Sequence, residues 1–219
     1  MLLGFNQGTT LKNSNTEKDL LLTEKYGFDF IEFQMGQIYS YLKNHTVQDL
    51  KIFFDNNRIK PYALNVLEYF NLKIPEEFKD VEKEFIRMCE IAVNIGCGII
   101  ILVPSRKNTE LTIKEIKDDS VNCIKRLLEI IYSRKYDIKL SYEFLGFSDF
   151  SVNNFSQCYE IISELNDERV GITLDCFHFY AGESKILDLK DAGSKKIFVF
   201  HVDNSKDKPL NELSDADRV

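Results

Sequence analysis

The hydrophobic pattern along the chain alternates between two periods. Short runs of β-branched and apolar residues, such as residues 98–103, are typical of strands that are covered on both faces. Longer segments between these runs carry apolar residues three and four positions apart, which predicts amphipathic helices. The expected strands cover residues 2–8, 28–34, 59–67, 98–103, 138–143, 170–175 and 196–202. The expected helices cover residues 16–26, 46–57, 75–96, 112–135, 153–166 and 184–191.

This order of elements predicts parallel strands that are joined by helical crossovers. No linker or low-complexity segment interrupts the sequence, so we expect a single domain over residues 1–219. Two architectures fit the pattern, namely a (β/α)8 barrel and an open doubly wound sheet. The glycine-rich phosphate fingerprint of dinucleotide-binding sheets is absent after the first expected strand, where Gly4 and Gly8 flank Phe-Asn-Gln.

Polar side chains that can bind metal follow three successive expected strands. Glu143 ends one strand, Asp175 ends the next 32 residues later, and His201 lies 26 residues further on. His178 and Asp203 lie close to the last two of these positions. The carboxyl ends of parallel strands all face one way, and α/β folds build their active sites there. Functional groups at the ends of several different strands favour the barrel, because an open sheet would concentrate them at one switch point.

The residue types at these strand ends suit a divalent cation. Glu143, Asp175 and His201 offer two hard oxygen ligands and one imidazole, a mixture that fits Mn²⁺, Mg²⁺, Co²⁺ or Zn²⁺. Such an ion could hold the carbonyl and neighbouring hydroxyl of a sugar and stabilise an enediolate, while a carboxylate beside it moves the proton. The competing interpretation is structural: a strand-end Asp often caps the next helix, and a strand-end Glu often pairs with Lys or Arg. His178 could bind substrate, bind a second metal, or satisfy a loop carbonyl.

Composition excludes several classes of partner. The net charge of −7 and the pI near 5.1 argue against binding to a nucleic-acid backbone. The five cysteines form no CxxC pair and mostly fall in apolar patterns, which is typical of reduced core residues in a cytoplasmic protein. The first residues lack the basic and long apolar segments of a signal peptide or membrane anchor. We therefore expect a cytoplasmic protein without a nucleic-acid or membrane partner.

Several runs of the sequence resemble one known family. They are Ile31-Glu-Phe, Tyr62-Ala-Leu-Asn65, Leu102-Val-Pro-Ser105, Ser141-Tyr-Glu-Phe-Leu-Gly146, Leu174-Asp-Cys-Phe-His-Phe-Tyr180 and His201-Val-Asp203. They are similar to the xylose isomerase-like TIM barrels, in particular the sugar phosphate isomerase/epimerase group with its inosose isomerases and ketose 3-epimerases. The resemblance implies a metal-dependent isomerase or epimerase that acts on a sugar or cyclitol through an enediolate.

The resemblance also implies roles for individual residues. Glu143, Asp175 and His201 would be metal ligands, and Glu143 would also carry the proton. His178 matches a substrate-contacting histidine, and Arg218, in the run Asp215-Ala-Asp-Arg218, resembles an arginine that contacts a substrate oxygen.

The family carries a fourth ligand, a second catalytic glutamate, on its eighth strand. The sequence stops at Val219, after the seventh expected strand, so we expect a barrel that lacks its last βα repeat and a site with three ligands. The first and seventh strands would then expose edges that a second copy of the chain or a complementing segment could cover.

This departure leaves two other hypotheses for the function. One is a non-catalytic truncated remnant, or a subunit that acts by binding. The other is an endonuclease IV-like AP endonuclease, which the spacing of Asp175 and His178 fits. Its multi-zinc site, however, needs histidines on early strands, where the sequence has only His45, and the acidic charge opposes DNA binding.

Overall fold

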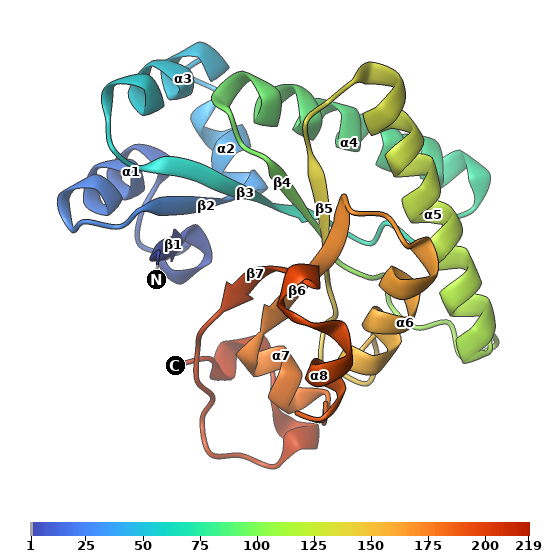
Figure 1. Ribbon diagram of the computed structural model, residues 1–219. Coiled ribbons are helices and arrows are strands. Elements are labelled where there is room, and N and C mark those ends of the chain that lie inside the picture. Colours follow the sequence, from blue (N-terminus) through green and yellow to red (C-terminus); the bar gives the residue numbers. More distant parts are fainter. Residues whose placement is uncertain (1) are drawn as a thin grey trace.

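The computed structural model describes residues 2–219, and its strands form one curled, seven-stranded sheet (Figure 1). The strands follow chain order across the sheet, and every neighbouring pair is parallel. They are β1 (Gly4–Asn6), β2 (Phe30–Gln34), β3 (Lys60–Leu67), β4 (Ile99–Leu102), β5 (Lys139–Glu143), β6 (Val170–Asp175) and β7 (Ile197–His201). The predicted barrel architecture is confirmed, with β1 and β7 at the two edges of the sheet among the described residues.

The helices pack outside the curled sheet and connect its strands (Figure 1). They are α1 (Thr16–Lys25), α2 (Met35–Tyr41), α3 (Val47–Asn56), α4 (Pro75–Ile95), α5 (Ile113–Arg134), α6 (Phe155–Leu165), α7 (Cys176–Ala181) and α8 (Asp188–Ala192). Capping boxes at Thr46 and Thr112 begin α3 and α5. The hydroxyl oxygen of each threonine accepts from the backbone N–H three residues later, and the backbone N–H of the threonine donates to the carboxylate of that residue. These two starts fall where the sequence predicted them.

Two helices were not predicted, and both begin directly after a strand. Helix α2 follows β2, and α7 follows β6, so no loop marks the point where either helix begins. The first predicted strand is also shorter than residues 2–8, because the Asn6 side chain accepts from the Gly8 N–H at 2.7 Å and turns Gln7–Thr10 into a 3-10 helix. The predicted helix over residues 184–191 lies instead at Asp188–Ala192.

The two faces of the sheet belong to different apolar clusters. In β4, Ile100 and Leu102 join the large cluster between sheet and helices, whereas Ile99 and Ile101 join a small cluster with Val199 of β7. Strands β4 and β7 are not neighbours in the sheet, so the small cluster fills the interior of the curl. The Tyr62 hydroxyl crosses the same interior and donates to the Phe198 carbonyl at 2.5 Å. These contacts hold β7 opposite β3 and β4 across the interior of the curl.

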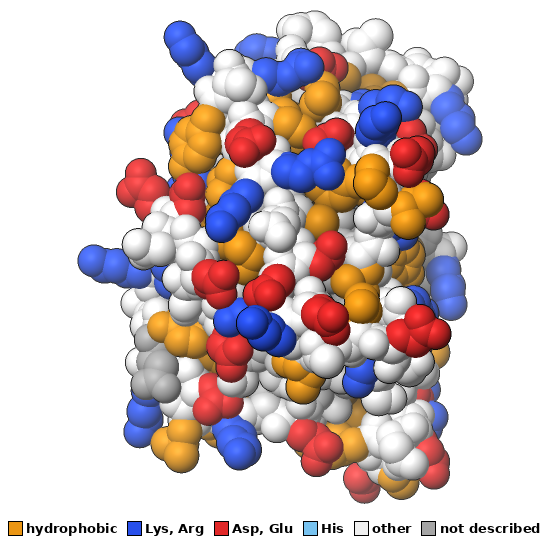
Figure 2. All heavy atoms as spheres, turned by 90° about the vertical axis from the view of Figure 1, so that its right-hand side faces the viewer, with side chains coloured by type: hydrophobic (Ala, Val, Ile, Leu, Met, Phe, Trp, Pro, Cys, Tyr) orange, Lys and Arg blue, Asp and Glu red, His pale blue; other side chains and the backbone are white. Residues whose placement is uncertain are grey.

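The outer helical surface carries charges of both signs. Figure 2 shows Lys and Arg side chains interspersed with Asp and Glu side chains on the right-hand face of Figure 1. Ion pairs join neighbouring helices, for example Lys117 to Glu164 at 3.0 Å and Arg126 to Glu82 at 2.9 Å. Exposed pairs of this kind contribute about 0–1 kcal/mol each. Among the helices of residues 2–219, none is long and apolar enough to cross a membrane.

Candidate metal centre

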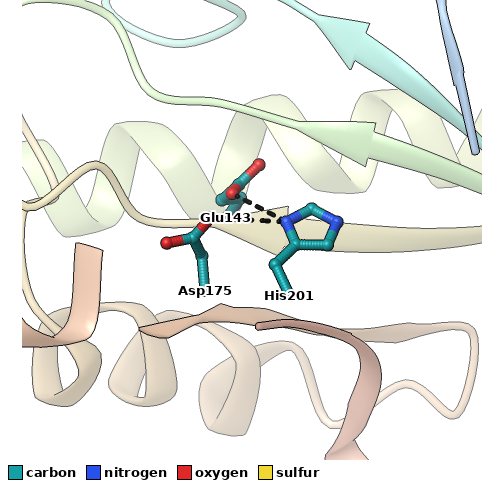
Figure 3. A group of neighbouring side chains, drawn as sticks. All are labelled: Glu143, Asp175 and His201. Atoms are coloured by element: carbon teal, nitrogen blue, oxygen red, sulfur yellow. Dashed lines mark ion pairs between the residues drawn. The ribbon is translucent and has the colours of Figure 1, made fainter. Parts of the chain in front are cut away.

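The three predicted ligands meet at the carboxyl ends of neighbouring strands. Glu143 ends β5, Asp175 ends β6 and His201 ends β7, and Asp175 and His201 are register partners across the β6–β7 pair. Figure 3 shows the two carboxylates turned toward the Nδ1 side of the imidazole. His201 Nδ1 lies 3.5 Å from Glu143 Oε1 and 3.5 Å from Asp175 Oδ2. The sequence therefore predicted correctly which three side chains come together.

The spacing of these atoms fits one divalent ion. One ligand atom from each residue lies within 4.8 Å of the others, and all three side chains are largely buried. Neighbouring ligands of a Zn²⁺ or Mg²⁺ ion lie about 3.0–3.6 Å apart, given metal–ligand distances of about 2.0–2.2 Å. Two carboxylate oxygens and one imidazole nitrogen are also the donors that such ions accept. The residues present therefore fit a divalent cation, without selecting one ion.

Asp175 caps a helix and also faces the candidate metal site, so both interpretations of its sequence position apply. Its Oδ1 accepts from the His178 N–H at 2.9 Å and caps helix α7, while its Oδ2 faces His201 and receives the Arg218 Nη1 at 2.8 Å. Burial raises the pKa of this carboxyl, but the hydrogen bond with His201 and the charges of His178 and Arg218 outweigh burial and lower the pKa below its usual range. Asp175 therefore stays ionised, while its Oδ1 atom holds the first turn of helix α7.

His201 lies between acidic groups on both sides of its ring. Its Nε2 is 2.8 Å from Oε2 of Glu32, on β2, which is 5% exposed. Burial lowers the pKa of His201, but the negative charge of Glu32 and the hydrogen bonds with Asp175 and Glu143 outweigh burial and raise the pKa well above its ordinary value. This site thus gathers more carboxylates than cationic groups, which favours a bound cation.

His178 lies beside this group with one tautomer favoured. The backbone N–H of Gly146 donates to Nδ1 at 3.1 Å, so Nδ1 is unprotonated and the ring hydrogen lies on Nε2. Burial lowers the pKa of His178 despite the nearby charges of Glu143 and Asp175, which favours the neutral ring. The Nε2 atom lies 2.9 Å from Nη2 of Arg218, so two hydrogen-bond donors face each other. An oxygen atom to one side of this pair, within hydrogen-bond distance of both nitrogens, would accept from both.

Arg218 is brought into the site by the segment that follows β7. Its guanidinium bonds Asp175 and Asp203 and lies over the Phe177 ring, with Cζ 4.6 Å from the ring centroid. Antiparallel backbone bonds between Asn204 and Val219, at 2.9 and 3.1 Å, hold the segment against the loop after β7. The side chain is 30% exposed, so the cation borders the site and reaches solvent.

No role was predicted for Glu32 from the sequence, although the residue lies in one of the runs that carry the family resemblance. Oε1 of Glu32 accepts from Asn6 Nδ2 at 3.0 Å and from Asn65 Nδ2 at 2.8 Å. A charged residue between the apolar Ile31 and Phe33, in the middle of an expected strand, was the available indication. Its partner could not be read from the sequence, because Glu32 and His201 are 169 residues apart.

His45 lies outside this site, in the segment between α2 and α3. Its ring stacks on Tyr41 at 4.2 Å between centroids, and its Nε2 is 2.9 Å from Glu17. Within residues 2–219, the structure forms one group of three potential ligands, the group of Glu143, Asp175 and His201. The early histidine that the endonuclease hypothesis would recruit therefore does not join them.

Comparisons with known proteins identify the family of the chain. A family model described as xylose isomerase-like TIM barrel matches residues 20–218. The chain is 42% identical over 220 residues to the inosose isomerase of Halalkalibacterium halodurans, covering 100% of the chain and 77% of that protein. It is 40% identical to the inosose isomerase of Bacillus subtilis, covering 78% of that protein.

Solved structures give the same result. The 1.8 Å crystal structure of IolI protein with a binding zinc atom superposes with a TM-score of 0.96 at 40% identity, over 100% of this chain and 78% of that one. A D-psicose 3-epimerase superposes with a TM-score of 0.73 at 14% identity, over 92% of this chain and 72% of that one, which is a likeness of fold alone. The chain belongs to the xylose isomerase-like TIM barrel family.

Proposed function

We propose that this protein is a divalent-metal-dependent isomerase whose substrate is an inosose or a closely related ketone of a cyclitol or sugar. The observation that carries the proposal is the buried group of Glu143, Asp175 and His201 at the ends of three neighbouring strands. Support for the substrate class comes from relatives named inosose isomerase, which are 38–42% identical across the whole chain.

The reaction moves a carbonyl between adjacent carbons of the substrate. A bound divalent ion would polarise the carbonyl and the neighbouring hydroxyl and would stabilise the negative charge that develops on their oxygen atoms. Glu143 takes a proton from the carbon that bears the hydroxyl, and the electrons of the broken C–H bond stay in an enediolate. A proton is then returned to the former carbonyl carbon. The hydroxyl proton passes to the former carbonyl oxygen, so atoms and electrons balance.

His178 and Arg218 bind an oxygen of the substrate. The favoured tautomer of His178 directs Nε2–H toward Arg218, and the two donors lie 2.9 Å apart at the border of the metal site. A hydroxyl or carbonyl oxygen accepts from both groups and removes the unfavourable contact between them. The two donors orient the substrate and stabilise the charge that develops on this oxygen.

Exchange of substrate hydrogen with solvent tests this function. The metal-loaded protein is incubated with an inosose in D2O, and the loss of carbon-bound hydrogen beside the carbonyl is followed by NMR. We expect metal-dependent deuterium uptake that Glu143→Gln abolishes. Glu164→Gln, which removes an exposed carboxylate from the outer helix α6, serves as the matched control and keeps the wild-type rate.

Absence of both deuterium exchange and conversion of the inosose in the fully metal-loaded wild type would contradict the isomerase. It would favour the alternative of a protein that binds such molecules without converting them. Uptake of deuterium that persists in Glu143→Gln would instead remove Glu143 from the proton transfer.

A further inference from the structure

We infer that Glu32 is a positioning residue for the metal ligand His201, setting the tautomer and the orientation of its ring. The inference rests on the metal site of the proposed function. It does not depend on which substrate the site accepts. Its basis is the contact of 2.8 Å between Glu32 Oε2 and His201 Nε2, made by two side chains that are 6% and 13% exposed.

The geometry assigns each nitrogen of the ring to one task. Nδ1 faces Glu143 and Asp175 at 3.5 Å, so Nδ1 is the atom that can reach the ion. Nε2 points the opposite way, to Glu32. An ionised carboxylate only accepts hydrogen bonds, so this contact keeps a ring hydrogen on Nε2, and a cation bound to the ring would take the place of the hydrogen on Nδ1. A histidine ligand in proteins commonly donates its second N–H to a carboxylate in this way.

The other neighbour of Nε2 cannot take this task. Asn6 Nδ2 lies 3.4 Å from Nε2, but the same amide nitrogen donates to Glu32 Oε1 at 3.0 Å. A donor cannot accept the Nε2 hydrogen, so Glu32 is the acceptor. Glu32 also lies beyond the ring from the proposed ion and is absent from the group of potential ligands among the described residues.

Glu32 is itself fixed by the strands on either side of β2. Its Oε1 receives Asn6 Nδ2 from β1 and Asn65 Nδ2, at 2.8 Å, from β3. With one oxygen held by two amides, the other oxygen has a defined direction toward β7. Three early strands thus set the position of a ligand carried by the strand at the opposite edge of the sheet.

Metal affinity gives a readout that is independent of turnover. Zn²⁺ is titrated into the metal-free wild type, Glu32→Gln and Glu32→Ala in competition with a chromophoric chelator. Loss of an outer carboxylate of this kind typically weakens metal binding about 10–100-fold, and we expect that range for both variants. Glu24→Gln is the matched control: the carboxylate of Glu24 accepts from the Ile59 N–H at 2.9 Å and touches none of the proposed ligands. Its affinity should equal that of the wild type.

The wild type also provides a direct test that needs no variant. Long-range ¹H–¹⁵N NMR of the zinc-loaded, histidine-labelled protein reports which ring nitrogen carries hydrogen. We expect His201 to be protonated at Nε2, with Nδ1 on the metal. A hydrogen on Nδ1, unchanged affinity in folded Glu32→Gln, or no zinc binding by the wild type would each overturn the inference. Zinc binding that depends on Glu32 without inosose exchange would instead sink the proposed function and leave the inference standing.

Discussion

Replacing Gly146 by alanine should separate helix α7 from the loop that follows β5. A Cβ atom at Gly146 would lie 2.3 Å from the His178 carbonyl oxygen and 2.7 Å from the Gly182 nitrogen. Both atoms are backbone, and they are joined to each other because the Gly182 N–H donates to the His178 carbonyl at 2.9 Å. Side-chain rotation therefore cannot relieve the overlap.

The size of the effect follows from this overlap. The His178 carbonyl must withdraw by roughly 1 Å to reach the 3.4 Å of an ordinary contact. Forcing an extra methyl group into packed structure costs about 1–3 kcal/mol. The same movement breaks the Gly146 N–H bond to His178 Nδ1, which contributes about 1 kcal/mol. A total of about 2–4 kcal/mol lowers the Tm of a protein of this size by roughly 4–16 °C.

Thermal unfolding followed by circular dichroism measures this change. Gly36→Ala is the matched control, because Gly36 lies in helix α2 and a Cβ there meets nothing within 4 Å. Alanine in a helix is favoured over glycine by up to about 1 kcal/mol, so this control should keep or raise the Tm. If Gly146→Ala unfolds within 2 °C of the wild type, the close approach of loop and helix, and with it the explanation of the His178 tautomer, is wrong.

Two further predictions concern the thiols and a helix cap. The half-buried Cys176 should be the thiol that reacts with a disulfide reagent in the native protein, because Cys89, Cys97 and Cys123 are buried and burial raises their pKa to about 12. Burial and the charges of the neighbouring aspartates also raise the pKa of Cys176, so the rate of its reaction with the reagent should keep increasing up to pH 9. Fast labelling of the variant Cys176→Ser would refute the assignment. Thr112→Ala should lower the free energy of unfolding in urea by about 1 kcal/mol, since it removes the oxygen that accepts from the Glu115 N–H, and equal stability of the two proteins would contradict this account of the cap.

The sequence predicted the strands well because a buried parallel strand has a distinctive composition. The run ending at Asp175 was placed at its observed bounds, and the polar residues at the ends of β5, β6 and β7 were assigned to one site. A parallel barrel brings such positions together whatever the detailed packing. The helix starts at Thr46 and Thr112 were also predicted, and the structure shows that each begins with a capping box between residues three positions apart.

The features that the sequence did not predict depend on contacts between distant residues. The pairing of Glu32 with His201 arises because β7 curls toward the early strands, which no local pattern encodes. The tautomer of His178 depends on a backbone N–H at Gly146, 32 residues earlier. Helix α7 was missed because its cap is Asp175, the same residue that ends the strand and faces the metal site.

Calorimetric titration of the metal-free protein with Zn²⁺ would show whether Glu143, Asp175 and His201 hold one divalent cation. Asp175→Asn is the informative variant: asparagine caps a helix about as well as aspartate, so helix α7 should remain folded while the charged ligand is lost. The account predicts one ion per chain in the wild type, and an affinity in Asp175→Asn that falls by more than about 100-fold, beyond the usual effect of an outer carboxylate. Wild-type protein that binds no ion, or a folded Asp175→Asn that binds as tightly as the wild type, would contradict it.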